Sequence, residues 1–443
     1  MRHLGLRALR WWAAVGVVVL VLSVGLVAVA AIEPAFEVRL GQRAVGEGRS
    51  LAELTEALEA EADRQMAREV TLAYQGQTWT YRLGELGRMA DAHQLQQSLA
   101  EAAASLPWWQ RLAWSRPVLA LEEAAGWDTA RLEAALQPIR EAIEQQPVPA
   151  SLAIIKREPV ITPEVDGVVL ETSAVLEALK TLGDQSTLEL PVTQQAPSVT
   201  RATLEAMRIK GLVAEWTTWY DPTIPRAENV ERAARAFDGL IVKPGEVLSY
   251  NGTVGPVDAA NGWKEAFVIV NGELVPGVGG GVCQVATTFY GAALRANLDI
   301  MERHQHQLAV SYIDPSQDAA IAQGWEDLKI RNTALGHLYI ETEAGDGRVT
   351  FRLYGEVPEG QEVKIESRVL GSQPFATKKV VDAKLAPGQQ VVKTHGNSGL
   401  RSEAYRLVYK SGKLVKREHL GTDSYLPTAQ VVLVGPEPAP QPA

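Results

Sequence analysis

The chain has 443 residues, of which 46% are hydrophobic and 22% charged, the balance of a folded globular protein long enough for two or three domains. Its formal net charge of −10 argues against a broadly basic surface, so neither nucleic-acid binding nor attachment to an anionic membrane face is expected. A single cysteine, Cys283, excludes a disulfide within the chain.

An uncharged run from Trp11 to Ile32 precedes the first predicted domain. At about 1.5 Å of rise per residue, a helix of roughly 22 residues crosses a hydrocarbon core of about 30 Å. Arginines at positions 2, 7 and 10 favour a cytoplasmic N-terminus. We therefore predict a transmembrane anchor within residues 1–34, in a single-pass protein of the cell membrane whose later domains are extracytoplasmic.

A cleaved signal peptide is the alternative interpretation of this segment. Ala28-Val29-Ala30 has the small residues of a cleavage site, but the apolar run exceeds the roughly 7–15 residues of a signal sequence. Its length favours the anchor, and both interpretations place the rest of the chain outside the cytoplasm.

Residues 35–200 are predicted to form a helix-rich α+β region. Ser50-Leu51-Ala52-Glu53 is a capping box that begins an amphipathic helix. Alternating segments at Val70–Tyr74 and Thr78–Leu83 predict a β-hairpin, because a period of two is typical of half-buried strands. Further helices are expected near residues 90–104 and 127–145.

The last part of this region, residues 150–200, has the pattern of a short α/β unit. We expect a strand at Leu152–Lys156, a helix at Thr172–Leu182 and a second strand at Leu188–Val192. Pro197 then indicates a boundary, because proline cannot continue a central strand.

Three further segments complete a predicted α+β multidomain architecture. An α+β domain is expected at residues 205–356, which are dense in glycine and contain Cys283. Residues 360–435 predict an all-β module of short alternating strands separated by glycine turns. Residues 436–443 form a proline-rich tail.

The glycine-rich loop before Cys283 is the most informative segment. Four glycines fall within residues 277–281, and such a loop allows a substrate backbone to approach and presents N–H groups. Small and apolar residues at helical spacing then predict a helix over Gln284–Asn297. Cys283 would stand at or just before the start of that helix, where free N–H groups and the helix dipole lower the pKa of a thiol and can form an oxyanion hole.

Two histidines, His304 and His306, follow this helix. If a strand runs from here to Tyr312, its period of two places both on one face. A histidine that faces Cys283 would form a thiolate–imidazolium pair. Two other interpretations stay open: zinc held by both histidines and Cys283, although no fourth ligand has a customary spacing, and a cysteine that is only a small buried hydrophobe.

Between Trp216 and Glu356 a series of motifs occurs in a fixed order. They are Asn229, Pro244-Gly245-Glu246-Val247-Leu248-Ser249-Tyr250-Asn251, Val254-Gly255-Pro256, Asn261-Gly262, Gly279-Gly280-Gly281-Val282-Cys283-Gln284, Glu302-Arg303 with His306, Val310-Ser311-Tyr312, Asp318-Ala319 and Asp327-Leu328-Lys329. This series resembles the VanW-domain family of bacterial exported proteins. The family usually has a glycine two residues before the aspartate of its Asp-Ala element, where this chain has Ser316, which could shift the loop around Asp318.

The flanking regions resemble the domains that accompany this family. Residues 60–195 are similar to the peptidoglycan-binding region that often precedes it. Residues 363–435 are similar to the five-glycine domain, a β module in which the matching glycines here are Gly388, Gly396, Gly399, Gly412 and Gly435.

The resemblance implies a role in the cell wall, because some members are understood to be L,D-transpeptidases that crosslink peptidoglycan stems through the cysteine. It implies Cys283 as nucleophile, His306 as general base and acid with His304 as second choice, and Asp318 as the group that orients the histidine or lies beside the substrate. Gly280, Gly281 and Gln284 would contact substrate and its oxyanion, and Arg303 a stem carboxylate.

The expected function is therefore peptidoglycan crosslinking or remodelling by cysteine-dependent acyl transfer, with no metal or other cofactor. The expected partners are stem peptides and glycan, and the membrane through the N-terminal helix. The alternative is a non-catalytic peptidoglycan-binding envelope protein linked to glycopeptide resistance, in which Cys283 only packs.

Overall fold

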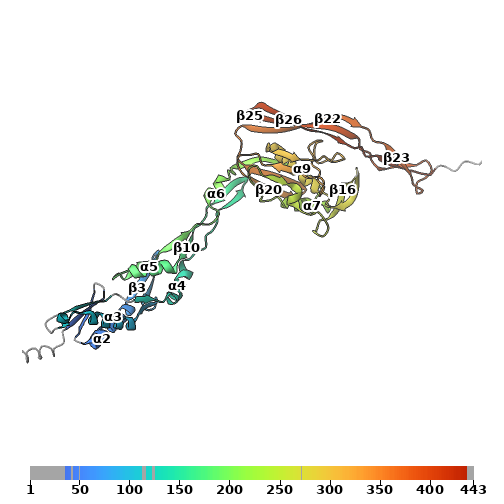
Figure 1. Ribbon diagram of the computed structural model, residues 1–443. Coiled ribbons are helices and arrows are strands. Elements are labelled where there is room, and N and C mark those ends of the chain that lie inside the picture. The colour runs from blue at the N-terminus through green and yellow to red at the C-terminus, as the bar shows by residue number, and fades with distance from the viewer. Residues whose placement is uncertain are drawn as a thin grey trace, which may run out of the picture. The chain divides into compact units, whose positions relative to one another are not determined.

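The computed structural model describes residues 35–40, 43–48, 50–111, 116–121, 125–270 and 272–436 (Figure 1). By their internal contacts they divide into two compact units. The first holds residues up to Val148 together with Val165–Pro197, and the second holds Pro149–Glu164 with the chain from Ser198 onward. Both units mix helices and strands, and the C-terminal part is rich in strands, which confirms the α+β class at this level.

Within the described ranges, no helix is both long and apolar enough to cross a membrane. The anchor predicted at residues 1–34 lies outside those ranges, as do residues 437–443 of the predicted tail.

The first unit consists of short sheets and four α-helices in its described part. The helices are α2 (Leu51–Ala67), α3 (Ala92–Ser105), α4 (Thr129–Ile143) and α5 (Thr172–Thr181). The strands are β1 (Phe36–Leu40), β2 (Arg43–Gly48), β3 (Glu69–Tyr74), β4 (Gln77–Arg82), β5 (Arg88–Ala90), β6 (Val118–Leu121), β7 (Ala125–Trp127), β10 (Gly167–Leu170), β11 (Thr187–Glu189) and β12 (Val192–Gln195).

The local sequence signals of this unit are mostly confirmed. Ser50 caps α2 by accepting a hydrogen bond from the Glu53 N–H at 3.3 Å, and β3 and β4 pair as the predicted hairpin. The strand predicted at Leu188–Val192 is wrong. Two strands, β11 and β12, flank Pro191, because proline has no N–H to donate to a ladder.

The second unit contains a globular α+β part followed by long strands. The helices are α6 (Arg201–Ala206), α7 (Arg226–Arg235), α8 (Tyr250–Val254) and α9 (Val282–Arg295). The strands of the globular part are β8 (Ser151–Ile155), β9 (Glu158–Thr162), β13 (Gly211–Trp219), β14 (Ile241–Val242), β15 (Val247–Ser249), β16 (Glu265–Val270), β17 (Glu273–Val278), β18 (Asp299–Glu302), β19 (Lys329–Arg331), β20 (Leu338–Gly345) and β21 (Arg348–Gly355).

Helix α9 is the central element of the globular part and packs on the sheet β13-β21-β20-β14. Its residues are almost all buried, and many are small, so the sheet can approach closely. A side chain at Gly291 would place its Cβ 2.3 Å from the Trp216 ring of β13. The predicted helix is therefore confirmed, and its position in the core fixes whatever stands at its N-terminus.

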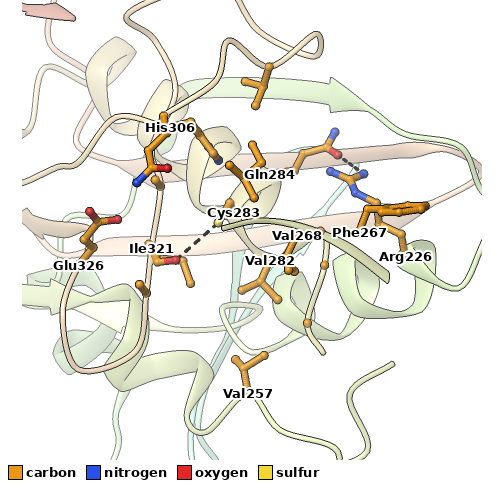
Figure 2. Close-up of a pocket in the computed structure, with 18 of the residues that line it drawn as sticks. Arg226, Val257, Phe267, Val268, Val282, Cys283, Gln284, His306, Ile321 and Glu326 are labelled. Carbon is orange, nitrogen blue, oxygen red and sulfur yellow. Dashed lines mark hydrogen bonds between the residues drawn. The ribbon is translucent and has the colours of Figure 1, made fainter. Parts of the chain in front are cut away.

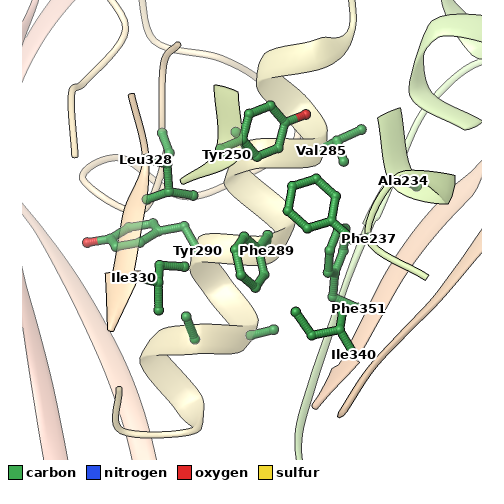
Figure 3. Close-up of a cluster of buried hydrophobic side chains, with 14 of the residues drawn as sticks. Ala234, Phe237, Tyr250, Val285, Phe289, Tyr290, Leu328, Ile330, Ile340 and Phe351 are labelled. Atoms are coloured by element: carbon green, nitrogen blue, oxygen red, sulfur yellow. The ribbon is translucent and has the colours of Figure 1, made fainter. Parts of the chain in front are cut away.

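An aromatic cluster fills the space between α9 and the sheet (Figure 3). The ring of Phe237 lies 5.1 Å from Tyr250, 5.2 Å from Phe289 and 5.5 Å from Phe351, measured between centroids. Fully buried aromatic rings contribute large apolar areas, so this cluster holds α9 in place.

The C-terminal strands form two three-stranded sheets, β22-β25-β26 and β23-β27-β24. Their members are β22 (Gln361–Gln373), β23 (Thr377–Val381), β24 (Gln390–Thr394), β25 (Gly399–Lys410), β26 (Lys413–Tyr425) and β27 (Gln430–Val434). The prediction of short strands is wrong for β22, β25 and β26, which have 12 or 13 residues each. Strands β25 and β26 continue through a tight turn at Ser411-Gly412, where both residues have positive φ.

Candidate functional site

The glycine loop before α9 is shaped by close contacts that only glycine tolerates. A Cβ at Gly280 would lie 2.6 Å from the Phe267 carbonyl oxygen, and Gly281, the N-cap of α9, has a φ of +107°. The buried amide of Asn229 donates to the carbonyl oxygens of Gly280 and Lys264, each at 2.9 Å. The loop is therefore a rigid support for the start of the helix.

Cys283 lies in the first turn of α9, as the sequence predicted. The Tyr250 hydroxyl donates to the Val282 carbonyl oxygen at 2.9 Å and so helps to hold this turn in place. The N–H groups of Val282 and Gln284 already donate to loop carbonyls, whereas that of Cys283 has no partner among the described residues. Within residues 281–284, the N–H groups of Gly281 and Cys283 are thus the two that remain to receive an oxyanion.

His306 and Asp318 complete a buried polar arrangement beside the thiol. One carboxylate oxygen of Asp318, Oδ2, accepts hydrogen bonds at 2.7 Å from both the backbone N–H and the Nδ1 of His306. His306 is 6% exposed and Asp318 1%. Because Nδ1 faces the carboxylate, Nε2 is the nitrogen left to interact with Cys283.

The strand predicted from the histidines to Tyr312 is wrong. Strand β18 ends at Glu302, His304 forms an isolated bridge with Ala320, and the following residues are a loop. The reason is that the Asp318 side chain takes the His306 N–H, which a ladder would otherwise use.

The pKa values follow from these contacts. Burial alone would lower the pKa of His306, but Asp318 and the Cys283 thiol raise it to about 9. Burial likewise opposes ionisation of Asp318, yet the His306 imidazole and the Arg303 charge lower its pKa to about 2. Burial raises the pKa of the Cys283 thiol, but His306 and the nearby Arg226 charge outweigh it and the pKa is lowered. Both shifts, down for the Cys283 thiol and up for the His306 imidazole, favour the thiolate–imidazolium form of this pair over the neutral form.

His304 is placed away from this arrangement. Its Nε2 lies 3.0 Å from Glu302 Oε1, its side chain is 37% exposed, and it does not line the cavity that contains Cys283. The two histidines therefore do not share a face. Across the described ranges no group of three or more His, Cys, Asp or Glu side chains is arranged to hold a metal ion.

Arg303, predicted to meet a substrate carboxylate, is engaged by two protein carboxylates in this structure. Arg303 donates to Asp318 Oδ1 at 2.9 Å and to both carboxylate oxygens of Asp423, and its side chain is 13% exposed. It lies behind Asp318 and does not line the cavity. Its charge stabilises the buried carboxylate instead, and Asp318 contacts His306 rather than the cavity.

An open cavity of about 470 Å³ lies over Cys283, a size suited to a peptide-like ligand. Gly280, Gly281, Gln284 and His306 line it together with apolar side chains such as Phe267. Figure 2 shows Cys283 at its centre, with the thiol directed to the Ile321 carbonyl oxygen at 3.6 Å.

Two charged side chains in this cavity were not found from the sequence. Arg226 and Glu326 lie to either side of Cys283 in Figure 2. Arg226 donates to Gln284 Oε1 at 2.6 Å, and Gln284 Nε2 in turn donates to Thr218 and to the Trp219 carbonyl. The polar atoms of Gln284 are thus used to hold Arg226. Both charged residues lie far in sequence from the cysteine motif, so no local pattern identified them.

The geometry defines a class of site in which a helix-start thiol faces a histidine oriented by a buried carboxylate. Comparison with known families then places this site within a VanW-like domain. Residues 225–354 match the family model described as "VanW like protein", residues 361–437 match "G5 domain", and residues 112–187 match "Putative peptidoglycan binding domain". The resemblance to VanW-domain proteins with these two companion domains is confirmed.

Two curated relatives share part of the chain. The uncharacterized protein YoaR of Bacillus subtilis is 33% identical over 169 residues, 38% of this chain and 56% of YoaR. The vancomycin B-type resistance protein VanW of Enterococcus faecalis is 34% identical over 110 residues, 24% of this chain and 40% of that protein. The chain thus spans about half the length of these relatives or less.

Among solved structures, the chain is similar to an IgA1 protease G5 domain. The identity is 23%, the match covers 18% of this chain and 94% of that domain, and the TM-score is 0.13.

The charge state of the site predicts how the thiol reacts with an alkylating reagent as pH changes. Because the pKa of Cys283 is lowered, the rate should rise at lower pH than for a free thiol, whose pKa is about 8.5. His306→Ala removes the partner of the thiolate and should move the rise toward the free-thiol value, reducing the rate at pH 7 by about tenfold. His304→Ala is the matched control and should leave the profile unchanged. Equal effects of the two variants would contradict the assignment.

Proposed function

We propose that this chain binds peptidoglycan and that its VanW-like domain transfers acyl groups between stem peptides, in the manner of a cysteine-dependent L,D-transpeptidase. The observation that carries the proposal is the series Cys283–His306–Asp318, in which the half-buried thiol and the histidine line an open cavity and the buried carboxylate lies behind the histidine. A nucleophile, a base and an orienting carboxylate in that order are what acyl transfer through a thioester requires.

In the first step, the Cys283 thiolate attacks the carbonyl carbon that precedes the terminal D-alanine of a tetrapeptide stem. The negative charge that develops on the carbonyl oxygen is received by the free N–H of Cys283 at the start of α9. His306 then gives its Nε2 proton to the departing amine. The amide bond breaks, D-alanine leaves, and a thioester joins the remaining stem to Cys283.

In the second step, the side-chain amine of a neighbouring stem attacks the thioester carbonyl. His306, now neutral, accepts a proton from this amine, and the sulfur leaves as thiolate. One amide bond has been broken and one formed, so no oxidant, energy source or metal is consumed. Water in place of the amine would give a carboxypeptidase reaction at the same site.

The charged side chains of Arg226 and Glu326 suggest how the site distinguishes the donor stem from the acceptor stem. Arg226 is close enough to Cys283 for its charge to lower the pKa of the thiol, and a guanidinium there suits the terminal carboxylate of the donor stem. The Glu326 carboxylate has no hydrogen-bond or ion-pair partner within the described ranges, and it suits the ammonium of the acceptor.

The comparisons support the wall-binding half of the proposal. One flanking region matches a peptidoglycan-binding family model, and a relative carries the name of a vancomycin resistance protein. Peptidoglycan lies outside the cytoplasmic membrane, so we propose that the apolar run at residues 11–32 anchors the chain and directs the remaining domains to that side.

The second candidate is a wall-binding protein without chemistry. It is favoured by the same comparisons, because their descriptions name binding and resistance rather than a reaction. The two candidates differ in one respect only: whether stem peptides are changed.

Crosslinking by purified protein separates the candidates. Muropeptides incubated with the wild type should yield free D-alanine and crosslinked dimers, detected by mass spectrometry. Cys283→Ala and His306→Ala should each lower the rate by about 10³-fold or more, because residues that act as a unit fail together. His304→Ala is the control variant and should crosslink like the wild type. Wall binding is the control assay and should be normal in all variants. Unchanged muropeptides with normal wall binding would establish the binding protein instead.

If Arg226 binds the donor stem and Glu326 the acceptor stem, substitutions of these two residues should affect different steps of the reaction. Arg226→Gln should lower kcat/KM for the donor by about 10- to 100-fold in both hydrolysis and crosslinking, because a hydrogen bond between charged groups is worth about 1.5–3 kcal/mol. Arg226→Lys should retain part of the kcat/KM for the donor that Arg226→Gln loses. Glu326→Gln should reduce crosslinking while hydrolysis by water is unchanged. If both variants reduced hydrolysis equally, the separation of donor and acceptor would be wrong.

A further inference from the structure

The end of strand β26, in the G5 domain, reaches the buried carboxylate of the site. The Tyr425 hydroxyl donates to Asp318 Oδ1 at 2.6 Å, on the opposite oxygen from the one that holds His306. Tyr425 is 4% exposed and Asp318 1%, so water has little access to replace this hydrogen bond. A residue outside the range that matches the VanW-like model therefore completes the coordination of Asp318.

A second residue of β26 acts through Arg303. The guanidinium donates to Asp318 Oδ1 and, through Nη1, to the Asp423 oxygens at 2.9 and 2.8 Å. Its Nε also donates to the Asp318 backbone carbonyl at 2.7 Å. Asp423 thus balances the charge of Arg303 and fixes its direction, which in turn fixes Asp318.

The loop that carries His306 is held by the same strand end. The Gln305 side chain donates to the Ser424 carbonyl at 2.7 Å and accepts from the Ser424 N–H at 3.3 Å. The Leu426 N–H donates to the Gln307 carbonyl at 2.8 Å. The residues on both sides of His306 are therefore bonded to the G5 domain.

The turn before Asp318 depends on the G5 domain as well. Ser316 has a φ of +63°, a left-handed conformation that is unfavourable for a residue with a side chain. Its N–H donates to the Tyr425 hydroxyl, and its own hydroxyl pairs with that of Ser402 in β25, both at 2.7 Å. These two buried contacts hold Ser316 in a turn where glycine would be unstrained.

We propose that the G5 domain is a structural part of the Cys283 site, with Tyr425 and Asp423 as positioning residues for the Asp318–His306 pair. The inference rests on the proposed thiol chemistry and extends the site beyond the VanW-like domain. The Asp318 carboxylate accepts four hydrogen bonds, two from His306 and one each from Arg303 and Tyr425. The bonds from Arg303 and Tyr425 depend on β26. Without them the carboxylate can turn away from Nδ1, and the imidazolium loses its stabilising charge.

The test is the pH profile of Cys283 alkylation in the full chain, compared between Tyr425→Phe and Tyr405→Phe. Tyr405 lies in the same domain, but its hydroxyl contacts Glu403, so it is the matched control. Tyr425→Phe should lower the rate about tenfold on the acid side of the profile, the loss expected when one hydrogen bond to a charged group is removed. The alkaline plateau should stay constant, because it reports access to a thiol that is already ionised.

A lower plateau would indicate a changed fold rather than a displaced carboxylate, so Asp423→Asn provides a second variant of the same shape. Removing that negative charge leaves Arg303 less balanced beside the imidazolium, and the acid-side rate should again fall with the plateau retained. If either well-folded variant had the profile of Tyr405→Phe, the inference would be overturned. No stem peptide is needed, so a wild type that alkylates as expected but never crosslinks would refute the proposed function alone.

Discussion

The carboxylate of Asp318 carries a full charge in a place where little water can reach it, and the site depends on how that charge is compensated. Moving a lone carboxylate into a protein interior costs several kcal/mol, so the ion persists only with excellent hydrogen-bond geometry. Here Arg303 and Tyr425 satisfy one oxygen and His306 satisfies the other through two donors. The same compensation that allows the charge to be buried also sets the tautomer of the imidazole and raises its pKa.

The thiol side of the site is built on a different physical principle. Cys283 is placed by helix α9, whose buried small residues pack against the sheet and the aromatic cluster. The glycine loop packs against neighbouring residues more closely than any side chain would allow, and it lines the cavity that contains the sulfur. Cys283 therefore faces His306, and the position of His306 is set through Asp318 by residues of the G5 domain. The two halves of the site are connected by Thr287 of α9, which exchanges hydrogen bonds with the backbone of Ala319 at 3.0 and 3.3 Å.

The features that the sequence predicted correctly are those that a few neighbouring residues determine. The capping box at Ser50 and the helix after Cys283 were predicted because a few consecutive residues determine each of them. The supposed strand through the histidines failed because Asp318 captures the backbone N–H of His306, an interaction that alternation cannot signal. Arg226, Glu326 and Tyr425 were missed for the same reason: each reaches the site through tertiary contacts, and their own sequence surroundings are ordinary. Ser316 was noticed as a departure from the family pattern, and its left-handed φ, supported by Tyr425 and Ser402, is the structural counterpart of that departure.

Intact-protein mass spectrometry can detect whether the sulfur of Cys283 carries the stem as a thioester. The wild-type protein would be mixed with a tetrapeptide muropeptide without an amine acceptor, and the reaction stopped in acid, where thioesters survive. We expect an adduct equal to the muropeptide minus D-alanine, located on Cys283 and absent from Cys283→Ala. We also expect that the adduct disappears when an acceptor stem is added. A protein that binds the muropeptide but never gains this mass would show that Cys283 forms no thioester with the stem.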